Sequence, residues 1–97
     1  MSETQRAFPQ CANSEKGVLA SLLLAPIESR YICAEKGVKA EHFYLPAHQI
    51  LFGAMVGVID DAKPLEFITL ATALSDAGQL ERIGGPAYIN ELFTFLP

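Results

Sequence analysis

Basic residues are scarce in this chain. Its 97 residues include seven Lys and Arg against eleven Asp and Glu, so the net charge is −4. No three basic residues cluster anywhere along the sequence. Non-specific binding to DNA or RNA draws most of its affinity from lysine and arginine side chains that neutralise phosphates. We therefore expect no direct nucleic-acid binding by this chain itself.

Long apolar runs and paired cysteines are also missing. The apolar stretch Val18–Pro26 is too short for a membrane-spanning helix, which needs ~20 residues. The opening MSETQRAFPQ lacks the apolar core of a secretory signal. Cys11 and Cys33 stand alone without metal-ligand spacing, so we expect both to be reduced thiols. The sequence thus predicts no membrane association and a cytoplasmic location.

The two histidines lack the spacing of a metal site. His42 and His48 lie six residues apart across Pro46, whereas two zinc-binding histidines on one helix are three or four apart. His48 would lie in the first turn of a helix that begins at Pro46. We interpret it as a packing or capping residue and predict no metal site.

Catalytic and phosphate-binding motifs are absent as well. Asp60 and Asp61 are adjacent at an expected helix end, where they point in different directions, so we interpret them as a solvated helix terminus. Gly84-Gly85 lacks the lysine of GxxxxGK[ST] and follows no expected strand, which indicates a turn and not a phosphate cradle. The sequence therefore predicts no catalytic residue and no cofactor-binding residue.

Apolar residues at helical spacing are what the chain has in quantity. Hydrophobic residues make up 51% of it, slightly above the usual range of about 45–50%, which favours some apolar surface for partners. They recur at i, i+3 and i+4 in five stretches joined by short connections. This pattern predicts an all-α fold, a compact orthogonal bundle of about five short helices. We expect residues 1–12 to form a flexible N-terminal arm and residues 13–97 to form one helical domain.

Local signals predict where the first two helices lie. Asn13 or Ser14 can cap a helix that ends before Pro26, and Glu15 would then lie near the positive end of that helix. A second helix over Glu28–Lys36 would end at Gly37 in a left-handed conformation. Its buried residues are expected to be Tyr31, Ile32 and Ala34.

The remaining helices have clearer boundaries. Pro46 suits a first helical position, because its missing N–H would be unpaired there. Asp60, Asp61 and Pro64 would end this third helix. A fourth helix is expected from about Phe67 to Ala77, and a fifth begins at the turn Gly84-Gly85-Pro86. The apolar face of the fifth helix is expected to consist of Tyr88, Ile89, Leu92, Phe93 and Leu96.

Two glycines share one face of the expected third helix. Gly53 and Gly57 lie four residues apart, and each costs roughly 1 kcal/mol relative to alanine within a helix. Such a pair indicates that something approaches this face closely. It is either another helix of the same domain, the first or the fifth, or a second subunit, and the sequence leaves both open.

Four blocks in a fixed order carry a family resemblance. They are SEKGVLASLLL (14–24), EHFYLPAHQILF (41–52), PLEFITLATAL (64–74) and GQLERIGGPAYINEL (78–92). In this order and spacing the chain resembles the N-terminal domain of DnaB-type replicative DNA helicases, from about Pro9 to Pro97. Two positions depart from the family pattern: Ala20 stands in place of a glycine, and Glu66 stands in place of an aspartate.

The resemblance implies an architectural function. In such helicases this domain is a helical head followed by a hairpin, a linker and a RecA-like ATPase domain. The heads form a collar on a hexameric ring and offer docking surfaces for primase and helicase loader. The parent protein would use ATP and magnesium, whereas we expect the present chain to be a fragment without motor activity and without cofactors.

Under this resemblance, apolar residues on the surface would make the contacts of the domain with other proteins. We expect self-association as a monomer or weak dimer here, with the hexamer belonging to the parent. A second hypothesis is a free-standing phage-type adaptor or regulator of replication built on the same helical head. The candidate interface residues are Gly53, Val56, Gly57, Phe93 and Phe95.

Overall fold

Five α-helices and two 3₁₀ helices make up the part of the chain that the computed structural model describes, residues 9–95. No strand occurs within those residues, which confirms the all-α fold class. No helix among them combines the length and apolar character that a membrane crossing requires. The elements are α2 (Pro9–Leu24), α3 (Pro26–Lys36), η1 (Ala40–His42), α4 (Pro46–Asp60), α5 (Phe67–Asp76), η2 (Glu81–Ile83) and α6 (Gly85–Phe93).

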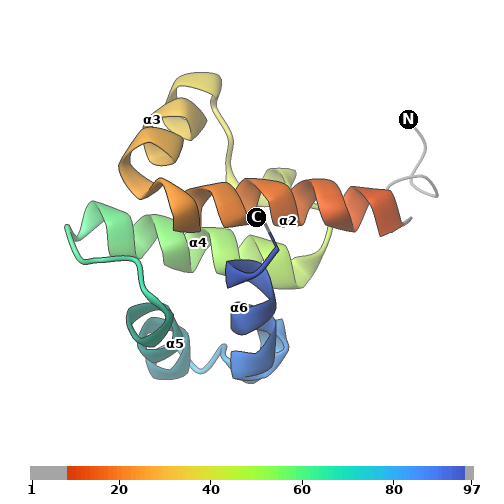
Figure 1. Cartoon of the computed structure of the whole chain (residues 1–97), viewed down its shortest axis with the longest axis vertical. Helices are drawn as coiled ribbons and strands as arrows, with labels where there is room; N and C mark the ends of the chain where they lie inside the picture. Colours follow the sequence, from red (N-terminus) through yellow and green to blue (C-terminus); the bar gives the residue numbers. More distant parts are fainter. Residues whose placement is uncertain (1–8, 96–97) are drawn as a thin grey trace.

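The helices are arranged around a central pair. α2 and α4 lie side by side across the middle of the molecule (Figure 1). α3 packs on one side of this pair, and α5 and α6 lie on the opposite side. α6 runs across the direction of α2 and α4, so the bundle is orthogonal as the sequence predicts.

The centre of the core comes from four of the five α-helices of the described chain. Each of α2, α4, α5 and α6 contributes two fully buried apolar side chains, spaced three or four residues apart so that both lie on one face. Burying each such side chain stabilises the fold by about 1.5–3 kcal/mol. These residues are Leu19, Leu22, Leu51, Met55, Leu70, Leu74, Ile89 and Leu92.

The first helix begins earlier than predicted. α2 begins at Pro9, so Asn13 and Ser14 lie inside the helix and not at its cap. Proline suits the first turn because its fixed φ is already helical and its missing N–H would be unpaired. The predicted arm over residues 1–12 is therefore wrong for residues 9–12, and residues 1–8 lie outside the described part of the chain.

The second helix turns a different face inward from the one predicted. Tyr31 and Ile32 are 66% and 48% exposed, and the buried residue of α3 is Cys33. Two polar contacts fix this orientation. Ser29 Oγ donates to the Ser21 carbonyl of α2 at 2.9 Å. The Arg30 guanidinium donates twice to the Asp60 carboxylate at the end of α4.

Cys33 is a free thiol, as predicted. Burial raises the pKa of the Cys33 thiol, with a smaller opposing effect from Arg30. The thiol therefore stays protonated at neutral pH and packs as a small apolar group. The prediction for Cys11 concerns a side chain outside the described ones.

The remaining helix boundaries follow the sequence signals closely. α4 begins at Pro46, α5 begins at Phe67, and Gly37 ends α3 with a left-handed φ of 72°. Gly84 has a φ of 107°, and a Cβ placed on it would lie 3.1 Å from the Cβ of Tyr88. The turn into α6 therefore requires glycine for both its backbone conformation and its lack of a side chain.

The two turns predict different responses to alanine. Gly37→Ala should cost about 1–2 kcal/mol of unfolding free energy, because φ is positive but the added methyl meets nothing within 4 Å. Gly84→Ala should cost at least about 1 kcal/mol more, because the methyl also presses on Tyr88. Urea denaturation of both variants measures the difference, and equal losses would contradict the close approach at Gly84.

Candidate interaction surfaces and the buried network behind them

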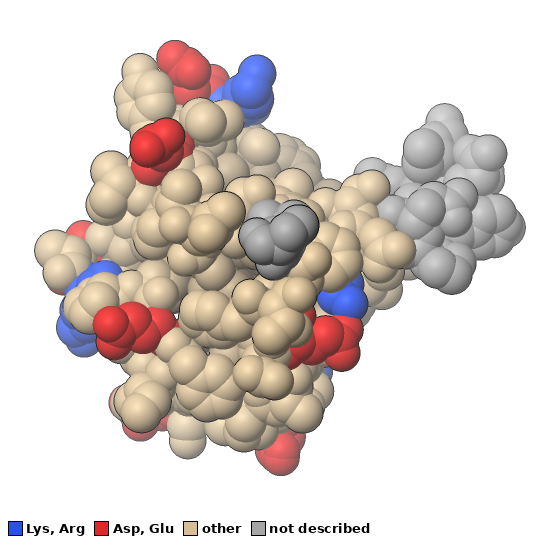
Figure 2. Space-filling view, viewed as in Figure 1, with Lys and Arg blue, Asp and Glu red and all other residues tan. Residues whose placement is uncertain are grey.

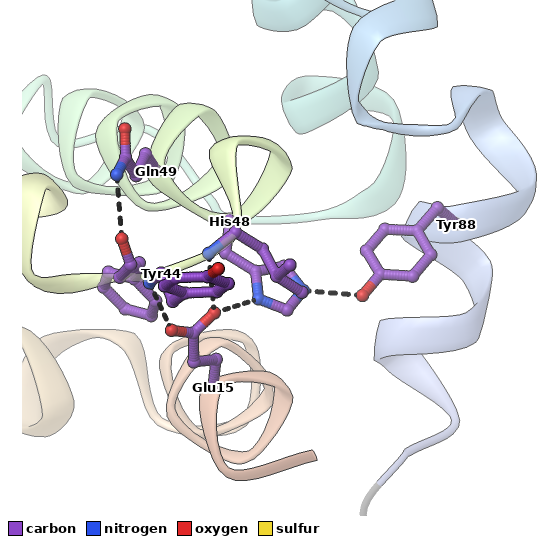
Figure 3. Close-up of polar contacts among 7 residues, drawn as sticks. Glu15, Tyr44, His48, Gln49 and Tyr88 are labelled. Carbon is purple, nitrogen blue, oxygen red and sulfur yellow. Dashed lines mark hydrogen bonds and ion pairs between the residues drawn. The ribbon is translucent and has the colours of Figure 1, made fainter. Parts of the chain in front are cut away.

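A buried histidine connects three helices. His48, in the first turn of α4, has no exposed surface. Its Nδ1 lies 2.7 Å from Oε1 of Glu15 on α2, and its Nε2 lies 2.6 Å from the hydroxyl of Tyr88 on α6 (Figure 3). A carboxylate only accepts hydrogen bonds, so Nδ1 carries the hydrogen, and in the neutral imidazole the Tyr88 hydroxyl donates to Nε2. The imidazole thus has both nitrogens paired.

Glu15 also caps the start of α4. Its carboxylate accepts hydrogen bonds from the backbone N–H groups of Tyr44 and Leu45, just before the first turn. Leu45 occupies the N-cap position and offers no side-chain cap of its own. A negative charge here also complements the positive end of the helix. The expectation that Glu15 acts on its own helix is therefore wrong, because α2 begins six residues before it and Glu15 serves the neighbouring helix.

Aromatic rings enclose the histidine. Tyr88 stacks on His48 with ring centroids 5.9 Å apart, and Phe43 meets it edge-on at 6.5 Å. Burial, and then the charges of Glu91 and Glu15, raise the pKa of Tyr88, so its hydroxyl stays protonated at neutral pH. Because His48 is fully enclosed, no substrate atom can reach it. This confirms the packing interpretation of His48.

His42 and the aspartate pair, which the sequence analysis considered and rejected as site residues, make separate contacts in the structure. His42 belongs to η1, where its Nδ1 accepts from the backbone N–H of Lys39 at 3.0 Å. Asp60 pairs with Arg30, and Asp61 is exposed after the last turn of α4. Within the described residues, no three His, Cys, Asp or Glu side chains are placed to hold a metal ion together.

The end of α6 is held to α2 by a lysine. The Lys16 ammonium pairs with the carboxylate of Glu91. It also lies 5.6 Å from the ring centroid of Tyr88 and 5.1 Å from that of Phe95, within the range of a cation–π contact. Phe95 is half-buried in consequence. The interface residue predicted at this position therefore makes contacts within the domain.

The five predicted interface residues do not share one surface. Gly53 and Gly57 are exposed on α4, whereas Val56 is half-buried against the core. Phe93 lies on α6, 38% exposed, with its ring 6.3 Å from that of Phe67. The two glycines line a groove between α4 and α5, whereas Phe93 lines a separate, smaller hollow beside Leu24 of α2.

A groove between α4 and α5 contains the glycine pair. A Cβ placed on Gly53 or Gly57 meets no atom of another element within 4 Å. Of the two alternatives that the sequence left open, a close crossing by a helix of the same domain is therefore wrong. The exposed Ile68, at the start of α5, lines the opposite wall. We call this feature the α4–α5 groove; its lining includes Gln49, Ile50, Gly53, Ala54, Gly57, Asp61, Lys63, Ile68, Thr72, Ala73, Asp76 and Gln79.

A second apolar surface was not predicted. Leu24, Ile27, Tyr31 and Ile32 are 72%, 74%, 66% and 48% exposed, around the turn from α2 into α3. We call these four residues the α2–α3 corner. The signal was visible as apolar residues at 24, 27 and 31, spaced by three and four, but we assigned two of the four to the core.

Charge is dispersed over the face shown in Figure 2. Lys and Arg appear there as separate spots and not as a basic patch. Much of that face is uncharged. Electrostatic attraction for a phosphate backbone is thus weak on the visible face.

Comparison with known proteins gives consistent matches. The model of a family described as the DnaB-like helicase N terminal domain matches residues 7–97. The chain is 36% identical over 99 residues to the replicative DNA helicase DnaB of Geobacillus stearothermophilus, covering 100% of this chain and 21% of that protein. It is 28% identical over 92 residues to the replicative DNA helicase DnaC of Bacillus subtilis (strain 168), covering 95% of this chain and 20% of that protein. The chain therefore spans about a fifth of the length of these curated relatives.

A solved structure has the same fold. The crystal structure of the N-terminal domain of DnaB helicase from Mycobacterium tuberculosis matches with a TM-score of 0.81 and 30% sequence identity. The match covers 89% of this chain and 58% of that one.

Removing members of the buried network should destabilise the domain. Glu15→Ala leaves His48 Nδ1 and two backbone N–H groups unpaired, so we expect a loss of about 3 kcal/mol in unfolding free energy. Tyr88→Phe leaves only His48 Nε2 unpaired and should cost about 1–2 kcal/mol. Tyr31→Phe is the matched control, because that hydroxyl is on an exposed residue and should change stability by less than about 0.5 kcal/mol. Urea denaturation measures these losses. Equal losses for Tyr88→Phe and Tyr31→Phe would contradict the role assigned to the Tyr88 hydroxyl.

Alanine at the groove glycines should have the opposite effect. Gly53→Ala and Gly57→Ala should each stabilise the domain by about 0.5–1 kcal/mol, because the methyl enters open space and glycine is a poor helix former. Thermal or urea unfolding measures this gain. If either variant were less stable than the wild type, close packing within the domain would again explain the glycine pair.

Proposed function

Because the chain belongs to the DnaB-like helicase N-terminal domain family, we propose that it is the interaction and oligomerisation head of a replicative DNA helicase. In this proposal the head contributes contacts between subunits and a docking surface for primase or a helicase loader. ATP hydrolysis and unwinding would belong to other parts of the helicase. The curated relatives that match over this length are named as replicative DNA helicases.

The observation that carries the proposal is the exposure of the α2–α3 corner. Four large apolar side chains are about half to three-quarters exposed there, within a stretch of nine residues. Single exposed apolar residues are ordinary, but a group of this kind indicates an interaction surface. Because Ile27 and Tyr31 are 74% and 66% exposed, packing against the core accounts for little of their apolar character.

A helix surface of this kind can pair with its own copy. In a two-fold contact the same patch serves both partners, so one apolar corner is sufficient. Ile27 and Tyr31 lie four residues apart on one face of α3 and could meet the same face of a second copy. The patch is small compared with the roughly 800 Å² per partner of a stable interface. We therefore expect this chain alone to be a monomer in equilibrium with a weak dimer.

Charge placed on the corner should abolish this association. Ile27→Glu should leave the chain monomeric at concentrations where the wild type begins to dimerise, because burying the carboxylate at the contact is costly. Ile68→Glu is the matched control, since Ile68 on α5 is also 74% exposed. Sedimentation equilibrium or light scattering across a concentration series measures both.

Two results would contradict the proposal. One is equal dimerisation by wild type and the Ile27→Glu variant. The other is dissociation by Ile68→Glu alone, which would move the contact to the opposite side of the molecule.

A further inference from the structure

Two of the residues that line the α4–α5 groove have no side chain. Gly53 and Gly57 lie one turn apart on α4, and a Cβ added to either would meet no other side chain and no other element of the described chain within 4 Å. Nothing inside the domain therefore requires glycine at these positions. An incoming side chain could approach the α4 backbone more closely here than at any position that carries a Cβ.

The walls of the groove are apolar and long enough for a helix. Ile50 and Ala54 of α4 and Ile68 and Ala73 of α5 are among the apolar residues that line the groove, and Ile68 is 74% exposed. The α4 residues that line it run from Gln49 to Asp61, which corresponds to about 18 Å at 1.5 Å per residue. That length matches about three turns of a bound helix.

The rim of the groove is acidic. Asp61 follows the last residue of α4, and Asp76 is the last residue of α5, so each carboxylate stands at a helix C-terminus. The C-terminal ends of both helices add partial negative charge. Lys63 is the one basic residue among the groove's lining. The complementary partner would carry Lys or Arg beside its apolar face.

One acceptor in the groove also lacks a partner. Oε1 of Gln79 is buried, and within the described residues it accepts no hydrogen bond. Gln79 lines the groove at the side of α5. Because this oxygen is buried, a donor from a bound partner would reach it only after the Gln79 side chain moved.

We propose that the α4–α5 groove docks a short amphipathic helix of another protein, with an apolar face and flanking basic residues. This inference rests on the proposed function only for the premise that the head binds other proteins. It concerns a different surface from the α2–α3 corner. The two can therefore fail independently.

A pair of synthetic peptides tests the proposal directly. The first is a three-turn helix with alanine and leucine on one face and lysine beside it, and the second has glutamate in place of each lysine. In an NMR titration of the ¹⁵N-labelled chain, the lysine peptide should shift the Gly53 and Gly57 amides and the side-chain amide of Gln79. The glutamate peptide should bind at least about tenfold more weakly, because the rim is acidic.

Two variants locate the site. Gly57→Leu adds a side chain to the groove and should weaken the lysine peptide at least about tenfold, whereas Gly17→Leu is the matched control on α2, where a Cβ also meets nothing within 4 Å. The double variant Asp61→Asn with Asp76→Asn changes only exposed side chains. In this double variant the lysine peptide should lose most of its advantage in affinity over the glutamate peptide. The double variant also tests the proposal if Gly57→Leu does not fold.

Several outcomes would overturn the proposal. They are equal binding of both peptides, no binding of either, and shifts that map to the α2–α3 corner. Loss of self-association by Gly57→Leu would make a second copy of this chain the occupant. The Ile27→Glu variant separates the two proposals, because it should lose self-association and keep the peptide titration unchanged.

Discussion

The arrangement of the helices depends on how His48 is paired. A fully buried imidazole is tolerated only when both nitrogens have partners, and here the partners come from two other helices, Glu15 on α2 and Tyr88 on α6. The same Glu15 carboxylate satisfies backbone donors at the start of α4. A shift of any one of the three helices would therefore leave several buried groups unpaired at once. The apolar core favours compaction in general, whereas this network selects one relative position of α2, α4 and α6.

That fixed position separates the two apolar surfaces. The α2–α3 corner lies on the α3 side of the central pair, and the α4–α5 groove lies on the α5 side (Figure 1). The two surfaces have no residue in common. If both proposals hold, a neighbouring subunit and another protein would contact different sides of the α2–α4 pair.

The sequence predicted what local chemistry determines and missed what distant residues determine. The starts of α4 and α5 and the Gly84-Gly85 turn follow from proline, glycine and apolar spacing within a few residues. The inward face of α3 does not, because Ile27 and Tyr31 form as good an apolar stripe as any core face. Ser21 and Asp60, which orient α3 through Ser29 and Arg30, lie eight and thirty residues away from them in sequence. No periodicity within α3 could reveal those partners.

The glycine pair shows the same limit at the candidate site. Two helical glycines on one face indicate that a side chain is unwanted there, but the sequence does not say from which direction the neighbour comes. The structure shows that this neighbour is not a helix of the same domain, since the space around Gly53 and Gly57 is open. The groove, the corner and the buried network use different residues. Because exposed residues such as Ile27 and Ile68 contribute little to the core, their apolar character is better explained by contacts outside the domain than by folding.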